Sequence, residues 1–197
     1  MMATATTVRA EELLNSNLNL MQATLPLTAA QIDEATPLAH LAAGSWSFQT
    51  YGSVTFGEDS GELYLAHAGF GYHPWDNISI NAEMVGGVVS AEDEGGESGT
   101  VGGDLLVRYH FLRGDGWSLY GEAGSGFLQT SMSFPANGTH FNFTPQAGIG
   151  LLMDLDDNMH LMAGARWHHV SNARMQGVGQ NPGYDAAMIY AGVLLRF

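Results

Sequence analysis

The sequence lacks both cysteine and lysine, and it is poor in positive charge. Among 197 residues there are six arginines and 20 acidic residues, which give a formal net charge of −14. The absence of cysteine excludes a disulfide scaffold, a thiol nucleophile and thiolate metal sites, although it does not determine the compartment. Nucleic acid is not an expected partner, because binding phosphates requires clustered cations.

Long apolar runs are also absent. The longest, residues 186–195, is too short for a membrane-spanning helix, which needs about 20 residues. The first 20 residues contain no uninterrupted apolar region typical of a secretory signal. Three explanations stay open: the start is wrongly placed, a leader was replaced or removed, or the protein is not exported. The third would allow a soluble barrel that binds a hydrophobic ligand.

What the sequence does contain is glycine and a strict alternation of apolar and polar residues. The 26 glycines are about twice the ordinary share, and an alternation with period two indicates β-strands. Eight such segments follow residue 44: 46–54, 62–72, 78–85, 105–111, 117–127, 141–153, 159–171 and 185–197. Residues 1–43 lack this pattern, and we expect an N-terminal extension there, with a short amphipathic helix near residues 8–22.

The connections between these segments also alternate in length. Residues 73–76, 113–116 and 155–158 suit tight turns, whereas residues 55–61, 88–100, 130–140 and 172–184 suit longer loops. An even number of strands with short turns at one rim and long loops at the other is typical of outer-membrane barrels. Residues 44–197 therefore predict an all-β fold, an eight-stranded antiparallel transmembrane β-barrel.

One face of each segment is apolar and the other is polar, as a barrel in a membrane requires. One face is nearly free of charge, and we expect it to face lipid, where a charge at the bilayer midplane costs about 2–4 kcal/mol. The other face would fill the lumen with paired polar groups. Its members are Glu83, Arg108, His110, Glu122, Gln146, Arg166, His168 and Arg196.

Three polar residues depart from this division at the long-loop rim. By alternation His169 and Ser171 fall on the apolar face at the end of one strand, and Asp185 falls on that face at the start of the next. Residues i and i+2 of a strand are about 6.6–6.8 Å apart, and an adjacent antiparallel strand brings Asp185 within reach of His169 in a suitable register. The pattern fits a nucleophile, a base and an acid. It equally fits polar residues at strand ends, where polarity is ordinary.

The residues around this rim carry a resemblance to a known family. "RWHHVSNA", the following "NPGYD" and the final strand "GVLLRF" resemble the lipid A 3-O-deacylase (PagL-like, acyloxyacyl hydrolase-related) family, and "FQTYGSV" adds a weaker likeness at the start of the barrel. The resemblance implies an outer-membrane esterase whose active site faces the outer leaflet. Its substrate would be lipid A within lipopolysaccharide, with outer-membrane lipids around it and no cofactor. The sequence leaves a homodimer open.

The resemblance also implies roles for individual residues. Ser171 matches the nucleophile, His169 the general base and Asn172 the residue associated with the oxyanion hole, while Asp185 is the counterpart of the acidic orienter. Two positions depart from the family pattern: the orienter is Asp where Glu is usual, and Arg174 stands where many members have glycine. We expect Arg174 either to contact a lipid A phosphate or to remain in solvent.

Two further hypotheses follow from the residues. A small membrane barrel without catalytic activity would need none of the matched side chains. A metal site is not expected, because His168 and His169 are adjacent on a strand and point to opposite faces.

Overall fold

The computed structural model describes residues 41–57, 61–91, 96–177, 179 and 181–197. The predicted N-terminal extension lies almost wholly outside these residues. Within these residues the chain forms nine strands. They are β1 (Trp46–Gly57), β2 (Glu62–Trp75), β3 (Ile78–Ala91), β4 (Gly96–Gly114), β5 (Trp117–Phe134), β6 (Thr139–Phe143), β7 (Gln146–Asp154), β8 (Met159–Val170) and β9 (Tyr184–Arg196). Within this described part, no helix has the length and apolar character to cross a bilayer.

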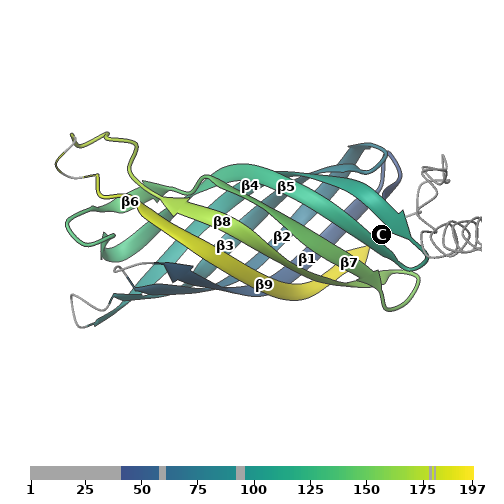
Figure 1. Ribbon diagram of the computed structural model, residues 1–197, viewed down its shortest axis with the longest axis horizontal. Helices are drawn as coiled ribbons and strands as arrows, with labels where there is room; N and C mark the ends of the chain where they lie inside the picture. Colours follow the sequence, from purple (N-terminus) through teal and green to yellow (C-terminus); the bar gives the residue numbers. More distant parts are fainter. Residues whose placement is uncertain (1–40, 58–60, 92–95, 178, 180) are drawn as a thin grey trace, which may run out of the picture. The chain divides into compact units, whose positions relative to one another are not determined.

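The strands close into a ring in which every pairing is antiparallel. β1 pairs with β2 on one side and with β9 on the other, so the first and last strands lie side by side (Figure 1). The remaining pairings run β2–β3, β3–β4, β4–β5, β5–β7, β7–β8 and β8–β9. The predicted eight-stranded barrel is confirmed, and its closure removes the unpaired edges that an open sheet would leave.

One predicted strand is divided. The segment 141–153 forms β6 and β7, with Thr144 and Pro145 between them, and β6 pairs with β5. Proline has no N–H to contribute to a ladder, which explains the break. Phe143, the last residue of β6 before this break, pairs with Ser171 as an isolated bridge.

Two of the predicted long loops are largely strand. β3 extends to Ala91 and β4 begins at Gly96, so most of residues 88–100 belongs to the sheet. β5 likewise runs to Phe134 within residues 130–140. The alternating segments ended earlier, which predicted loops there, but the ladder between β3 and β4 continues to the pair Ala91 and Gly96. The loop after β8 remains long, since β9 begins at Tyr184.

The alternation of faces is confirmed along the strands. In β2, for example, Leu65, His67 and Gly69 are buried between the exposed residues Tyr64, Ala66 and Ala68. Large apolar side chains remain exposed on the outer face of most strands. The architecture is therefore that of an outer-membrane β-barrel, with an apolar exterior and a polar interior.

A charged network fills the centre of the barrel. Glu122 accepts hydrogen bonds from the buried side chains of Arg108 (Nη2, 3.0 Å) and Arg166 (Nε, 2.6 Å). The guanidinium carbon of Arg108 lies 4.4 Å from the ring centroid of Tyr120, and that of Arg166 lies 4.4 Å from that of Tyr190. These contacts join β4, β5, β8 and β9 through the interior.

Candidate active site

The end of β8 and the start of β9 bring His169 and Asp185 together. The two residues are register partners across the antiparallel pair. His169 Nδ1 donates to Asp185 Oδ1 over 2.9 Å. An exposed fraction of 22% for the His169 side chain and 61% for that of Asp185 places the contact on the outer face. An exposed ion pair contributes little to folding, typically 0–1 kcal/mol, so stability gives no strong reason for this arrangement.

Trp167 supports the same carboxylate. Its Nε1–H donates to Asp185 Oδ1 over 2.8 Å. Its ring also stacks on His169, with centroids 5.7 Å apart and an interplanar angle of 25°. Asp185 thus receives two donors from β8 and the imidazole is held against an indole, which restricts the orientation of both groups.

Ser171 follows His169 by two residues and is held by its backbone. Its N–H donates to the Phe143 carbonyl over 3.1 Å, and its carbonyl accepts from the Phe143 N–H over 2.7 Å. Ser171 and Phe143 are both half-buried. The break at Pro145 therefore leaves a short strand, β6, whose last residue fixes the position of the serine.

The His169–Asp185 contact assigns the proton on the imidazole. A carboxylate only accepts, so Nδ1 carries the hydrogen and Nε2 presents its lone pair. Among the described residues no hydrogen bond joins Nε2 to the Ser171 hydroxyl, as is common for a catalytic pair without substrate. The carboxylate thus orients the imidazole, and Ser171 lies one same-face position further along the chain.

Asn172 and Arg174 begin the loop after β8. Asn172 is buried, its N–H donates to Asn181 Oδ1 over 2.9 Å, and its own Oδ1 accepts from the Arg174 N–H over 2.9 Å. The second contact closes an Asx turn, which fixes the Asn172 amide. Arg174 is exposed with φ +62°, and glycine adopts such a left-handed conformation more easily than arginine does.

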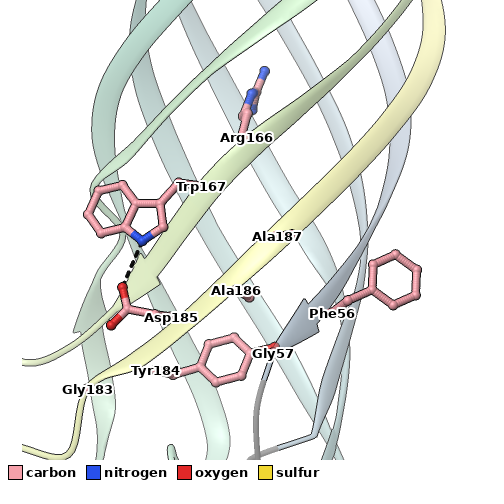
Figure 2. A pocket seen from close by; sticks show the side chains of 9 residues that line it. All are labelled: Phe56, Gly57, Arg166, Trp167, Gly183, Tyr184, Asp185, Ala186 and Ala187. Carbon is pink, nitrogen blue, oxygen red and sulfur yellow. Dashed lines mark hydrogen bonds between the residues drawn. The ribbon is translucent and has the colours of Figure 1, made fainter.

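An open groove of about 890 Å³ lies beside Asp185. Figure 2 shows Trp167 and Asp185 on one side of it and Phe56 on the other. Its lining also includes Gly57, Arg166, Gly183, Tyr184, Ala186 and Ala187. The groove combines an apolar wall with a carboxylate, a suitable surface for an amphiphilic ligand.

The sequence did not single out three residues of this site: Trp167, Asn181 and Gly183. Alternation put Trp167 on the face of His169, but nothing in the pattern indicated a contact with Asp185. A Cβ atom on Gly183 would lie 3.1 Å from His169 Cε1, so glycine lets the loop approach the imidazole closely. The signal available was the "NPG" that precedes Tyr184 and Asp185.

Comparisons with known proteins bear on the fold and the family of this chain. Residues 46–193 match the family model described as lipid A 3-O-deacylase (PagL). The crystal structure of the outer membrane enzyme PagL superposes with a TM-score of 0.62 at 22% identity, and the match covers 73% of this chain and 97% of that one. No curated protein matches the sequence.

Other barrels share the fold. The N-terminal β-barrel domain of Pseudomonas aeruginosa OprF gives a TM-score of 0.55 at 18% identity, over 79% of this chain and 98% of that one. Neisserial surface protein A gives 0.58 at 14% identity, over 78% and 96%. At such identities the structures establish the architecture, whereas the family model spans most of the barrel sequence, including His169, Ser171 and Asp185. The chain therefore belongs to the lipid A 3-O-deacylase (PagL) family.

Proposed function

We propose that this protein is an outer-membrane ester hydrolase that removes the 3-O-linked acyl chain from lipid A. The observation that carries the proposal is the hydrogen bond from His169 to Asp185 on the outer face of the barrel, with Ser171 two residues further on the same strand. Membership of the family supplies the substrate class.

The proposed orientation follows from the distribution of polar groups. The apolar outer face suits the bilayer, and the trio is at the end of β8 and the start of β9, next to the longest described connection. In outer-membrane barrels the longer loops face outward. The site then lies at the outer leaflet, where lipid A is found and can approach sideways within the membrane.

In the proposed reaction Ser171 Oγ attacks the ester carbonyl carbon while His169 Nε2 takes the hydroxyl proton. The imidazolium that forms keeps its Nδ1–H on Asp185, which stabilises it and fixes its orientation. His169 returns the proton to the sugar oxygen as the carbon–oxygen bond breaks. A water molecule, deprotonated by His169, then cleaves the acyl-serine, releasing the fatty acid and restoring the serine.

Asn172 is the residue that we assign to the oxyanion. It follows the nucleophile directly; its side-chain Oδ1 accepts from the Arg174 N–H, and its backbone N–H donates to Asn181 Oδ1. A fixed donor is worth about 3–4 kcal/mol in other acyl-transfer enzymes, because it needs no reorganisation as charge develops. Arg174, exposed at the same rim, is assigned to a phosphate of the lipid A head group.

The groove beside Asp185 is the proposed path for an acyl chain. Phe56, Trp167 and Ala187 give it an apolar wall that methylene groups can contact. On the other flank of Ser171, Phe143 and Phe141 pack edge to face with centroids 5.4 Å apart. Apolar surface around the nucleophile favours a lipid ester over a water-soluble one.

Two rival functions stay testable. The fold does not separate an enzyme from a barrel without catalytic activity, since OprF and Neisserial surface protein A share it. A soluble barrel that binds a hydrophobic ligand would normally present an apolar lumen, whereas this lumen holds Arg108, Glu122 and Arg166. The catalytic proposal is favoured because the oriented His169–Asp185 pair has little structural value at the surface.

Mass spectrometry of lipid A from bacteria that produce the wild type or Ser171→Ala tests the proposal. We expect the wild type to remove one 3-linked hydroxyacyl chain and the variant to remove none, with equal amounts of folded barrel in the membrane. Unchanged lipid A with both proteins would contradict the proposal, as would equal deacylation by both. Loss of a chain from another position would retain the esterase and reject the 3-O specificity.

A further inference from the structure

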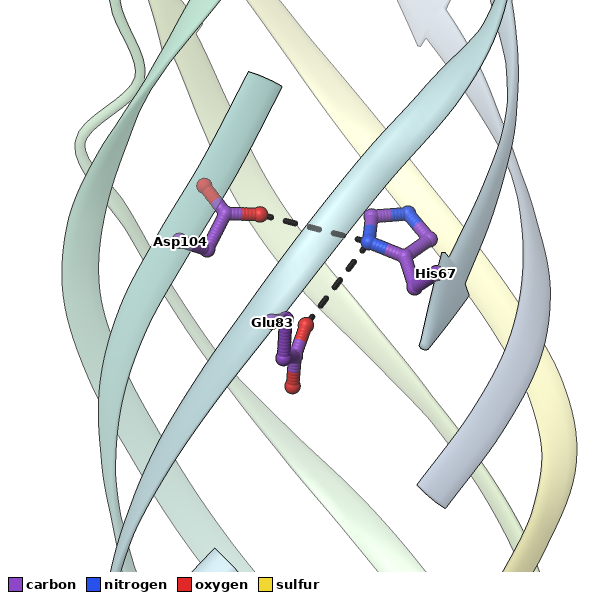
Figure 3. Close-up of side chains that lie close together, drawn as sticks. All are labelled: His67, Glu83 and Asp104. Carbon is purple, nitrogen blue, oxygen red and sulfur yellow. Dashed lines mark ion pairs between the residues drawn. The ribbon is translucent and has the colours of Figure 1, made fainter. Parts of the chain in front are cut away.

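A second group of polar residues lies inside the barrel, away from the outward-facing trio. His67 of β2, Glu83 of β3 and Asp104 of β4 are all buried, and each can offer one ligand atom within 4.8 Å of the other two (Figure 3). The sequence predicted no metal site on the positions of His168 and His169 alone; these three residues come from three neighbouring strands. We propose that they bind one divalent first-row transition metal ion, with Zn²⁺ as the ion to test.

The distances within the group suit a shared metal ion better than a shared proton. His67 Nδ1 lies 3.7 Å from Glu83 Oε2 and 3.9 Å from Asp104 Oδ2. Ligand atoms bound tetrahedrally at about 2.0–2.2 Å to one ion are separated by roughly 3.3–3.6 Å, so both distances would have to shorten by a few tenths of an ångström when the ion binds. A protonated Nδ1 would need an acceptor at about 2.7–2.9 Å for a charge-assisted hydrogen bond. Among the described residues Nδ1 has no hydrogen-bond partner, although it is fully buried.

The contacts around the imidazole leave Nδ1 as the atom for the metal. Ser53 Oγ lies 2.9 Å from His67 Nε2, and the Tyr51 ring stacks on the imidazole with centroids 4.3 Å apart. With the Nε2 hydrogen donated to Ser53, Nδ1 presents its lone pair to the two carboxylates. Metal-binding histidines commonly donate their other N–H to such a partner, which sets the tautomer and the ring orientation.

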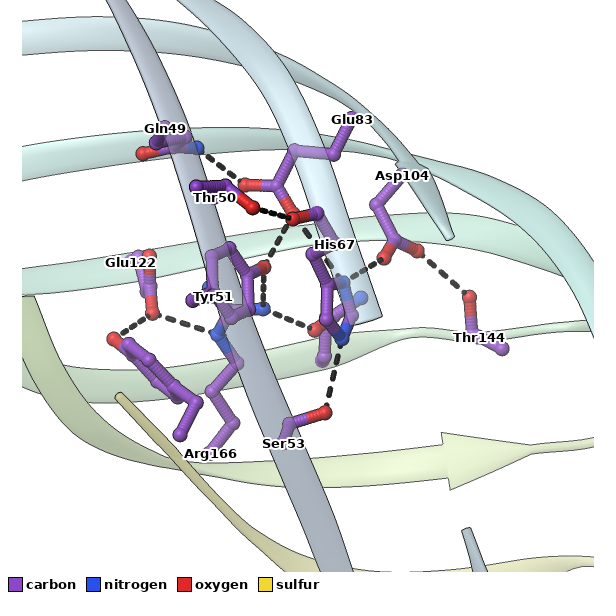
Figure 4. Close-up of polar contacts among 12 residues, drawn as sticks. Gln49, Thr50, Tyr51, Ser53, His67, Glu83, Asp104, Glu122, Thr144 and Arg166 are labelled. Carbon is purple, nitrogen blue, oxygen red and sulfur yellow. Dashed lines mark hydrogen bonds and ion pairs between the residues drawn. The ribbon is translucent and has the colours of Figure 1, made fainter. Parts of the chain in front are cut away.

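The carboxylates are held in place as well. Asp104 Oδ1 accepts from Thr144 Oγ1 over 3.1 Å, which leaves Oδ2 directed at His67. Glu83 accepts from the Gln49 side chain and the Tyr51 hydroxyl (Figure 4). Glycine provides the space: a Cβ atom at Gly126 would lie 2.0 Å from Asp104 Oδ1.

The charges of the interior also favour a cation here. The described buried residues include three carboxylates, Glu83, Asp104 and Glu122, and two guanidinium groups, Arg108 and Arg166. Both arginines pair with Glu122. Within the described chain, His67 is the only group within ion-pair distance of Glu83 or Asp104. One nitrogen and two oxygen ligands suit Zn²⁺ or a neighbouring divalent ion.

The test uses the untagged full-length protein, folded in detergent, stripped with a chelator and titrated with Zn²⁺. We expect one Zn²⁺ per chain after desalting and a higher melting temperature in its presence, because an ion that binds only the folded state stabilises it. Asp104→Asn and His67→Gln should lose the retained ion and the shift. His110→Gln, a buried histidine that contacts Ser118 instead, should keep both.

Ser53→Ala provides a variant that keeps all three ligands. Removing an outer partner of a metal ligand weakens binding by about 10–100-fold, so an intermediate affinity is expected. Failure of the wild type to retain Zn²⁺, or equal retention by Asp104→Asn and His67→Gln, would overturn the proposal. The readouts are metal content and melting temperature, so they do not depend on the proposed esterase activity or on Ser171.

Discussion

Two carboxylates of this barrel accept hydrogen bonds in opposite surroundings. Glu122 is buried between Arg108 and Arg166 in the centre of the barrel. Asp185 is exposed on the outer face and accepts from Trp167 and His169. A buried charge that loses its partner costs several kcal/mol, whereas an exposed pair contributes little. The difference indicates that Glu122 serves the fold and that Asp185 serves another purpose, for which we propose catalysis.

Substituting the proposed base should have the largest effect. His169→Gln keeps a polar side chain of similar size but cannot take the serine proton. We expect deacylation to fall on the order of 10⁴-fold or more, as when a member of a catalytic triad is removed. Single-turnover assays on purified lipid A would measure the fall, and the urea midpoint should stay near that of the wild type. Retained activity would remove His169 from the mechanism.

Glu122→Gln should lower the stability of the barrel and leave its activity nearly unchanged. Removing the charge leaves Arg108 and Arg166 buried without their carboxylate, which costs about 3–5 kcal/mol. Equilibrium urea unfolding in lipid vesicles, followed by tryptophan fluorescence, measures the loss. The deacylation rate of the fraction that remains folded should be nearly unchanged. An unaltered unfolding midpoint would show that the central network contributes little to stability.

Asp185→Asn is the matched partner of that variant, since both replace a carboxylate by an amide. We expect a loss of activity of about 10²–10⁴-fold, because the amide no longer holds the imidazole in the required tautomer. The free energy of unfolding should change by less than about 1 kcal/mol. Asp185→Glu, which keeps a carboxylate, should retain more activity than Asp185→Asn. A loss of stability as large as that of Glu122→Gln would make Asp185 a structural residue.

Arg174→Gly should have the smallest effect, and it should raise the stability of the protein slightly. Arg174 adopts φ +62°, which costs a residue with a side chain about 1 kcal/mol. Glycine relieves this strain, although it adds freedom to the unfolded chain, so the gain in stability should remain below that figure. If Arg174 contacts a lipid A phosphate, the variant should also bind substrate more weakly, with a higher KM and a similar kcat. Unchanged KM would place Arg174 in solvent.

The period of two and the polarity of its two faces determined the barrel from the sequence alone. A strand has only two faces, so alternation fixes which residues point inward once a lumen exists. The same reasoning placed His169, Ser171 and Asp185 on one face. Their proposed chemistry came from the resemblance in the motif and remains a proposal.

Only the tertiary structure decided what happens across strands. Register cannot be deduced from alternation, because a shift by two residues leaves the pattern unchanged. Register pairs His169 with Asp185, and the barrel brings His67, Glu83 and Asp104 together from three strands. The break at Pro145 and the extent of β3 to β5 likewise depend on hydrogen bonds to neighbouring strands. The sequence determined the faces, and the closure of the sheet determined which residues meet.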